Sequence, residues 1–133
     1  MIVEHPDVQA VSFTGSVGVG QQVASQCAAR MAKVQLEMGG KNPQIVLDDA
    51  DLDLALNGVL WGAFGTTGQR CTATSRLILH ENIHDEFVQK LQAKAEKLRV
   101  GSGLDDTTEM GPVINTKQFA KIKEYIEIGK NEG

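Results

Sequence analysis

The sequence predicts an α/β fold built around a parallel sheet. Short segments rich in β-branched residues alternate along the chain with longer segments whose apolar residues recur every three or four positions. Strands that alternate with helices in this way are typical of parallel α/β proteins. The 133 residues suffice for one domain, and 41% hydrophobic with 23% charged residues is the composition of a globular protein.

The first half of the chain is expected to contain one helix and three strands. Alternating apolar positions with β-branched and aromatic side chains indicate the strands. Ser16 is a suitable N-cap for the helix, whose apolar stripe repeats every four residues up to Met31. Cys27 lies on that stripe, so we expect it in the core, without a redox role. The predicted elements are strand 9–13, helix 16–31, strand 33–38 and strand 44–47.

The second half is expected to contain three helices and one strand. Acidic residues at 48–51 suit the positive N-terminal end of a helix, and Trp61 is expected in its core-facing side. Asn115 with Gln118 resembles a capping box that opens the last helix. The predicted elements are helix 50–64, strand 75–80, helix 82–99 and helix 115–130, the last with Phe119, Ile122 and Ile126 buried.

Charge and composition exclude several classes of function. The net charge of −4 argues against nucleic acid or an anionic membrane as a partner. No apolar run approaches the ~20 residues of a membrane span, and no signal peptide is visible. Two cysteines indicate no disulfide framework, which favours a reducing, cytoplasmic location. His80 and His84 have no third ligand nearby, so no metal site is expected.

One stretch has the features of a nucleophilic site. Cys71 follows a glycine turn at Gly68, stands next to Arg70, and lies between an apolar helical segment and an apolar strand. A neighbouring cation or backbone N–H groups aimed at the sulfur would raise the thiolate fraction of such a cysteine. The alternative is an ordinary buried core cysteine.

Two further stretches present polar groups near glycines. Gly15, Gly18 and Gly20 lie in a turn from strand to helix, where a phosphate could approach the backbone and the helix end. Their spacing departs from the Gly-x-Gly-x-x-Gly fingerprint, so an ordinary glycine turn is the alternative. Glu37 ends a predicted strand before Gly39 and Gly40, where a surface carboxylate is the simpler interpretation.

Taken together and in order, these motifs resemble the NAD(P)-dependent aldehyde dehydrogenase superfamily. The motifs are Phe-Thr-Gly-Ser at 13–16, Leu-Glu-Met-Gly-Gly-Lys-Asn-Pro at 36–43, and Gly-Gln-Arg-Cys at 68–71. Within the superfamily the chain is most similar to α-ketoglutaric semialdehyde dehydrogenases. Because family members are several times longer, the resemblance implies a fragment of the aldehyde dehydrogenase fold. Residues 1–39 would be the end of the cofactor-binding domain, and residues 40–133 the start of the catalytic domain.

The resemblance also implies roles for individual residues. Cys71 would be the nucleophile and Glu37 the general base in oxidation of an aldehyde, such as a small semialdehyde, to a carboxylic acid. NAD or NADP would be the cofactor, and the full-length protein would be a homo-oligomer. The residues expected at the cofactor are Thr14, Gly15, Ser16, Gly20, Met38 and Gly39.

Two other functions remain open at this point. The chain is also compatible with a truncated, non-catalytic piece that only binds partners. A thiol esterase would need only Cys71 and Glu37 and no cofactor. A Cys–His hydrolase is disfavoured, because no histidine stands in a motif that indicates a base.

Overall fold

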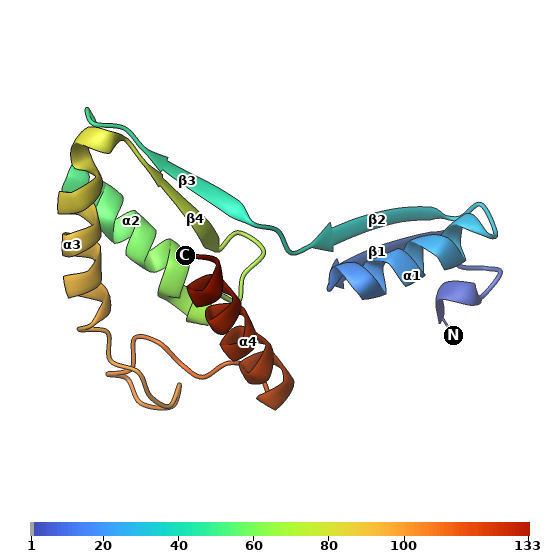
Figure 1. Ribbon diagram of the computed structural model, residues 1–133. Helices are drawn as coiled ribbons and strands as arrows, with labels where there is room; N and C mark the ends of the chain where they lie inside the picture. The colour runs from blue at the N-terminus through green and yellow to red at the C-terminus, as the bar shows by residue number, and fades with distance from the viewer. Residues whose placement is uncertain (1) are drawn as a thin grey trace. The chain divides into compact units, whose positions relative to one another are not determined.

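The chain forms two compact units, Met1–Lys41 and Asn42–Gly133. The computed structural model describes residues 2–133. Each unit combines a pair of parallel strands with helices (Figure 1), as the sequence predicts. The division between the units lies close to the boundary expected after residue 39, although the assignment of the two parts to cofactor and catalytic domains stays a prediction.

The first unit is built from β1 (Ala10–Gly15), α1 (Val17–Ala28) and β2 (Lys33–Met38). A short 3-10 helix, η1 (Ile2–Glu4), precedes β1, and the Arg30 side chain donates hydrogen bonds to the carbonyl oxygens of Val3 and Val8. The two strands run parallel, and α1 packs against both. Helix α1 is the crossover that parallel neighbours require. Cys27 on α1 is fully buried, which confirms its place in the core.

Helix α1 ends three residues earlier than the sequence predicts. Its last turn closes with hydrogen bonds from Ala32 N–H to the Cys27 carbonyl (3.0 Å) and from Met31 N–H to the Ala28 carbonyl (3.2 Å). Met31 itself is left-handed, with φ of 61°, and its side chain is 92% exposed. This is the Schellman arrangement, which usually takes glycine at the left-handed position. The apolar stripe therefore does not reach Met31, and that prediction is wrong.

The second unit contains a β-α-β arrangement followed by two further helices (Figure 1). Strands β3 and β4 are parallel, and α2 connects them and packs against β4 and α3. The elements are β3 (Asn42–Val46), α2 (Leu52–Phe64), η2 (Gly65–Gly68), β4 (Thr74–Leu79), η3 (Glu81–Ile83), α3 (His84–Ala95) and α4 (Thr116–Glu132).

The core of this unit is small and lies between the sheet, α2 and α3. It consists of Val46, Leu56, Val59, Ile83 and Phe87. On α2 the side chains of Leu56 and Val59 are fully buried.

Trp61, which was also expected in the core, is instead 67% exposed. Two residues along a helix correspond to a rotation of about 200°. Trp61 consequently faces away from the side that carries Val59, and the core prediction for the tryptophan is wrong.

Helix α4 begins as predicted but does not pack as predicted. Asn115 caps it, accepting a hydrogen bond from the Gln118 N–H at 2.9 Å on its side-chain oxygen. Phe119 is 55% and Ile126 is 51% exposed, and α4 has no buried residue. The periodicity of α4 therefore indicated an apolar face correctly, but the core of the second unit is built without it.

Within residues 2–133, no helix combines the length and the apolar character needed to cross a membrane.

Candidate functional site

The carboxyl ends of β1 and β2 bring most of the predicted site residues together. In the parallel register, Thr14 lies opposite Glu37 and Gly15 lies opposite Met38. Ligands of open α/β sheets bind at this end of the strands. Thr14 and Glu37 are both exposed, so a hydroxyl and a carboxylate face solvent at one edge of the first unit.

The N-terminus of α1 starts at the same edge. Ser16 is the N-cap, and its Oγ accepts a hydrogen bond from the Val19 N–H at 3.4 Å. The remaining N–H groups of the first turn have no partner inside the helix, and the helix dipole is positive there. At Gly18 nothing lies within 4 Å of the place where a Cβ would stand, so the backbone is open to an approaching group. This end of the unit can accept an anion.

Gly20 packs closely against the side chain of Met38. It is buried, and a Cβ there would lie 2.5 Å from the sulfur of Met38. A larger residue at position 20 would therefore force the flexible Met38 side chain to move, whether or not a cofactor binds. Contacts of Gly20 and Met38 with a cofactor stay a prediction.

Cys71 lies in the second unit, as a free, exposed thiol. It occupies the second position of a four-residue turn that is closed by a hydrogen bond from Ala73 N–H to the Arg70 carbonyl (3.1 Å). A turn corner presents its side chain to solvent, whereas a core position would enclose it. The interpretation of Cys71 as a buried core cysteine is therefore excluded for this chain.

The segment before the turn has an unusual backbone. Thr66, Thr67 and Gly68 are all left-handed, with φ of 52°, 59° and 65°. For non-glycine residues this conformation costs roughly 1–2 kcal/mol each. Two contacts to segment 111–114 support it: the Thr67 hydroxyl donates to the Gly111 carbonyl (2.9 Å), and Gln69 Oε1 accepts from the Ile114 N–H (3.0 Å). No sequence signal marks the two threonines as left-handed.

Arg70 is held against α2. Its guanidinium lies 3.7 Å from the centre of the Trp61 ring, and its Nη2 donates to the Trp61 carbonyl at 2.9 Å. The Nε atom is buried without a hydrogen-bond partner. The exposed tryptophan thus serves as a platform for the residue that precedes Cys71.

Asn42 holds the other side of the turn, and sequence reasoning missed it. Its Nδ2 donates to the carbonyl oxygens of Cys71 (2.7 Å) and Ala73 (3.0 Å). The available signal was an asparagine directly before Pro43 at the start of a strand, a place where side-chain hydrogen bonds often replace missing backbone ones.

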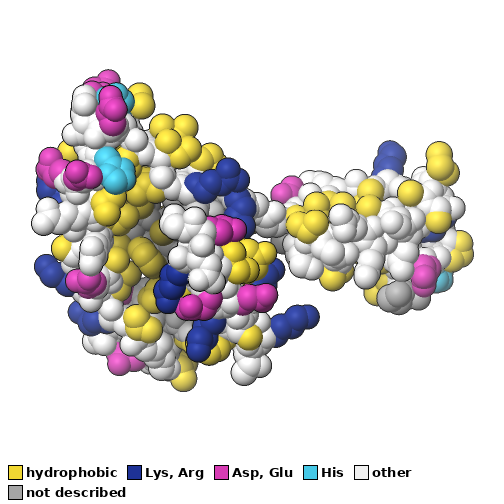
Figure 2. Space-filling view, viewed as in Figure 1, with side chains coloured by type: hydrophobic (Ala, Val, Ile, Leu, Met, Phe, Trp, Pro, Cys, Tyr) yellow, Lys and Arg dark blue, Asp and Glu magenta, His cyan; other side chains and the backbone are white. Residues whose placement is uncertain are grey.

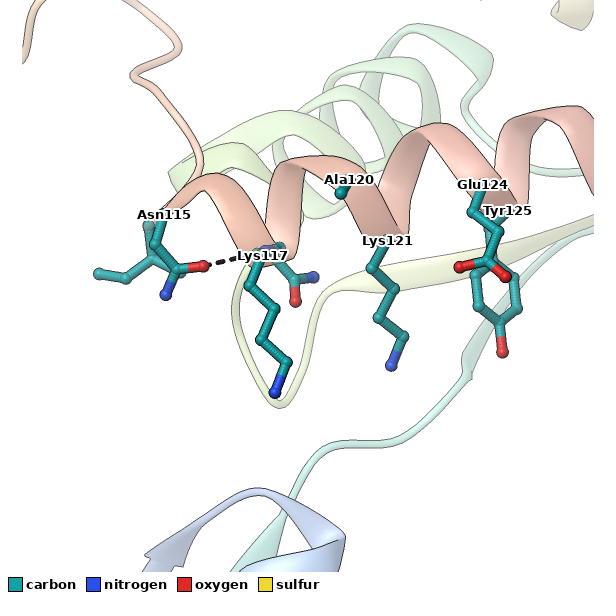
Figure 3. A pocket seen from close by; sticks show the side chains of 8 residues that line it. Asn115, Lys117, Ala120, Lys121, Glu124 and Tyr125 are labelled. Atoms are coloured by element: carbon teal, nitrogen blue, oxygen red, sulfur yellow. Dashed lines mark hydrogen bonds between the residues drawn. The ribbon is translucent and has the colours of Figure 1, made fainter.

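Among residues 2–133 there is no group of three histidine, cysteine, aspartate or glutamate side chains that could hold a metal ion. A depression along α4 is lined only by residues between Ile114 and Tyr125 (Figure 3). Because a single exposed helix and its cap line it, this depression is an open flank and not an enclosed site.

Comparisons with known proteins agree with these observations. The model of the aldehyde dehydrogenase family matches residues 1–133. The chain is 48% identical over 132 residues to an α-ketoglutaric semialdehyde dehydrogenase of Bacillus subtilis, and 44% identical over 133 residues to a betaine aldehyde dehydrogenase of Rhizobium leguminosarum. These matches cover 99% and 100% of this chain but 27% of each relative.

Solved structures give the same result. Betaine aldehyde dehydrogenase from Staphylococcus aureus in complex with NAD+ is 41% identical, with a TM-score of 0.96 over 99% of this chain and 26% of that chain. An aldehyde dehydrogenase from Bacillus cereus is 42% identical, with a TM-score of 0.95 over 99% of this chain and 27% of that chain. The chain thus spans about a quarter of the length of its relatives. It belongs to the aldehyde dehydrogenase family.

Proposed function

We propose that residues 1–133 are the segment of an NAD(P)-dependent aldehyde dehydrogenase that carries its nucleophile, Cys71, and its general base, Glu37. The reaction is oxidation of an aldehyde to a carboxylic acid. The observation that carries the proposal is the exposed Cys71 thiol at a turn corner, in a chain that matches the family over its whole length. The small semialdehyde expected as substrate is supported by the 48% identity to the semialdehyde dehydrogenase of Bacillus subtilis.

The first unit fits a dinucleotide. The carboxyl ends of two parallel strands, an exposed Thr14 and the N-terminus of α1 at Ser16 lie at one edge, and this edge would accept a pyrophosphate. Gly15 and Gly39 would let the backbone approach the cofactor, and Gly20 and Met38 would also contact it. When bound, NAD or NADP supplies the acceptor for the hydride that leaves the substrate carbon.

Cys71 performs the first covalent step. Its thiolate attacks the aldehyde carbon, a C–S bond forms, and the carbonyl electron pair moves onto oxygen. The Cys71 backbone N–H would donate to that oxyanion, while the Ala73 N–H closes the turn. Loss of hydride from the same carbon restores the carbonyl and leaves a thioester on the sulfur.

Glu37 performs the second step. Its carboxylate takes a proton from water, whose oxygen attacks the thioester carbon. The C–S bond then breaks, Cys71 leaves as a thiolate, and the carboxylic acid is released. The two residues belong to different compact units, so the proposal requires that the complete enzyme bring them to one substrate.

The remaining assignments belong to the same proposal. Residues 1–39 would complete a cofactor domain and residues 40–133 would open a catalytic domain. The partner would be a small-molecule aldehyde, with no role for nucleic acid or membrane. A homo-oligomeric full-length enzyme in the cytoplasm is the expectation that follows from the family resemblance.

Two variants of the enzyme that contains this segment test the proposal. Cys71→Ser should abolish oxidation, because a hydroxyl without a paired base is a far weaker nucleophile. Glu37→Gln should keep acylation and hydride transfer but slow thioester hydrolysis by about 10²- to 10⁴-fold. Stopped-flow absorbance should then show a burst of reduced cofactor near one equivalent per site, followed by a slow steady rate.

Cys27→Ala is the matched control, because Cys27 is fully buried in the first unit. It should leave the burst unchanged. Normal turnover by Cys71→Ser, or loss of the burst in folded Cys27→Ala, would show that the nucleophile is assigned wrongly. Ester hydrolysis that needs Cys71 but is indifferent to NAD(P), without aldehyde oxidation, would favour the thiol esterase instead.

A further inference from the structure

Asn42 lies at the start of the pairing between β3 and β4, where the register of the two strands shifts. Asn42 pairs with Thr74, but the next residue, Pro43, pairs with Arg76, so Ser75 is an extra residue in β4. Proline has no N–H and cannot donate to the ladder. The Asn42 side chain therefore takes over the hydrogen bonding at this end of the sheet.

The Asn42 carboxamide continues the hydrogen bonding between the strands into the turn that precedes β4. Its Nδ2 donates at 2.7 Å to the carbonyl of Cys71 and at 3.0 Å to the carbonyl of Ala73. Both partners can only accept, so the NH2 group and not the amide oxygen must face them. With only one of these hydrogen bonds, the Asn42 side chain could still rotate about that bond. The two bonds together hold the side chain in one orientation.

As a result, both peptide groups that flank Cys71 are held. The peptide before it is tied by the bond from Ala73 N–H to the Arg70 carbonyl (3.1 Å). The peptide after it is tied by the Asn42 Nδ2 at 2.7 Å. When both flanking peptide planes are held, the direction of the Cys71 Cα–Cβ bond and of its N–H is held as well.

We propose that Asn42 is a positioning residue for Cys71. Its carboxamide holds the peptide that follows the nucleophile, and so aims the thiolate and the oxyanion-binding N–H at the substrate carbonyl. The catalytic part of this inference rests on the proposed function. Asn42 also follows Glu37 by only five positions along the chain, so one short segment, 37–42, both carries the base and aims the nucleophile.

The test uses three substitutions at position 42 in the enzyme that contains this segment. Asn42→Asp keeps the size but points oxygen acceptors at two carbonyl oxygens, Asn42→Ala removes the group, and Asn42→Ser keeps one shorter donor. If donation matters, the rate constant of the reduced-cofactor burst should fall in the order wild type, Ser, Ala, Asp. The Asp variant should lose about 10²-fold, the scale of a misplaced reacting group, with little change in KM.

Gln44→Ala is the matched control. Gln44 Oε1 accepts the Thr74 hydroxyl at 2.9 Å, so this variant also removes a side-chain bond between β3 and β4 but leaves the turn untouched. It should lower Tm without changing the burst rate constant. If Asn42 only fills space, the burst rate constant of Asn42→Asp should equal that of wild type, and that of Asn42→Ser should equal that of Asn42→Ala. This result would overturn the proposal.

Hydrogen exchange separates the inference from the proposed function. The Ala73 amide, which closes the turn, should exchange about tenfold faster in Asn42→Asp and unchanged in Gln44→Ala. Unchanged exchange together with an unchanged burst overturns the positioning role while the function of Cys71 stands. Normal turnover by Cys71→Ser overturns the function, and faster Ala73 exchange would then still show that Asn42 holds the turn. Should Asn42→Ala fail to fold, the Ser and Asp variants give the same comparison.

Discussion

At the scale of single residues, the turn that carries Cys71 is held by one stacked arginine and by hydrogen bonds to backbone carbonyls. The guanidinium of Arg70 is stacked on Trp61 and bonded to its carbonyl, an arrangement worth roughly 0.5–2 kcal/mol for the stacking alone. Arg70 therefore anchors the turn to α2. Asn42 anchors it to the sheet with two neutral hydrogen bonds.

A carboxylate in the loop before α4 shows a clear effect of hydrogen bonding on its pKa. Asp105 accepts the backbone N–H and the hydroxyl of Thr107, each at 2.8 Å, and these two bonds lower the pKa of Asp105 below its ordinary value of 3.8. A lowered pKa means that the ionised form is favoured in the folded loop. The contribution to loop stability is therefore present above about pH 3.8 and is lost as the pH falls through the lowered pKa.

Removing one of the two donors should raise the pKa of Asp105. Thr107→Val deletes the hydroxyl but keeps the backbone N–H, which is the larger cause, so the pKa should move only part of the way back to 3.8. NMR titration of the Asp105 carboxyl carbon measures this. Thr108→Val, which leaves both donors in place, is the control, and an equal shift in both variants would contradict the assignment.

At the scale of elements, the close approach of α2 to β4 depends on one glycine. A Cβ at Gly62 would overlap the Thr74 hydroxyl, whereas a Cβ at Gly58, one turn earlier on α2, would meet only the end of the Gln44 side chain at 3.4 Å. Thr74 is short, β-branched and already bonded to Gln44, so it has little room to move. The two glycines differ in their neighbours although they share a helix.

Alanine at these two positions should have opposite effects. Gly62→Ala should lower the free energy of unfolding by about 1–3 kcal/mol, the usual cost of overpacking. Gly58→Ala should raise it by up to about 1 kcal/mol, because alanine is the better helix former and meets no clash. Thermal or urea unfolding of the two variants in the enzyme that contains this segment measures both changes. Equal effects of the two substitutions would show that helix propensity alone governs α2.

At the scale of the whole molecule, the chain exposes more surface than compact domains of its size. It exposes 10014 Å², whereas two separate compact domains of the same sizes would expose about 8,000 Å² in total. Hydrophobic side chains are visible on the surface of each unit (Figure 2). They include Leu104 at 98%, Ile114 at 79%, Leu54 at 72% and Ile45 at 63% exposed. Surfaces of this kind are covered in stable proteins.

The isolated 133-residue chain should consequently associate or unfold without a sharp transition. Binding of 8-anilinonaphthalene sulfonate would detect exposed apolar surface. Sedimentation would detect association, and calorimetry would detect poor cooperativity of unfolding. The enzyme that contains this segment, measured under the same conditions, is the control and should bind little dye. A sharp, reversible melt of a monomeric chain would contradict this expectation.

Local chemistry along the chain determined the order of helices and strands, the caps at Ser16 and Asn115, the buried Cys27 and the three motifs of the family. These features depend on neighbours a few residues apart, so they can be predicted from sequence patterns. Tertiary structure alone decided the exposure of Trp61 under the Arg70 guanidinium and the two bonds of Asn42 to the turn of Cys71. The two Asn42 bonds span 29 and 31 residues and form only after β3 and β4 have paired, so no local periodicity encodes them. The Arg70–Trp61 contact spans only nine residues, but it depends on the left-handed backbone of Thr66 and Thr67, which no sequence pattern marks.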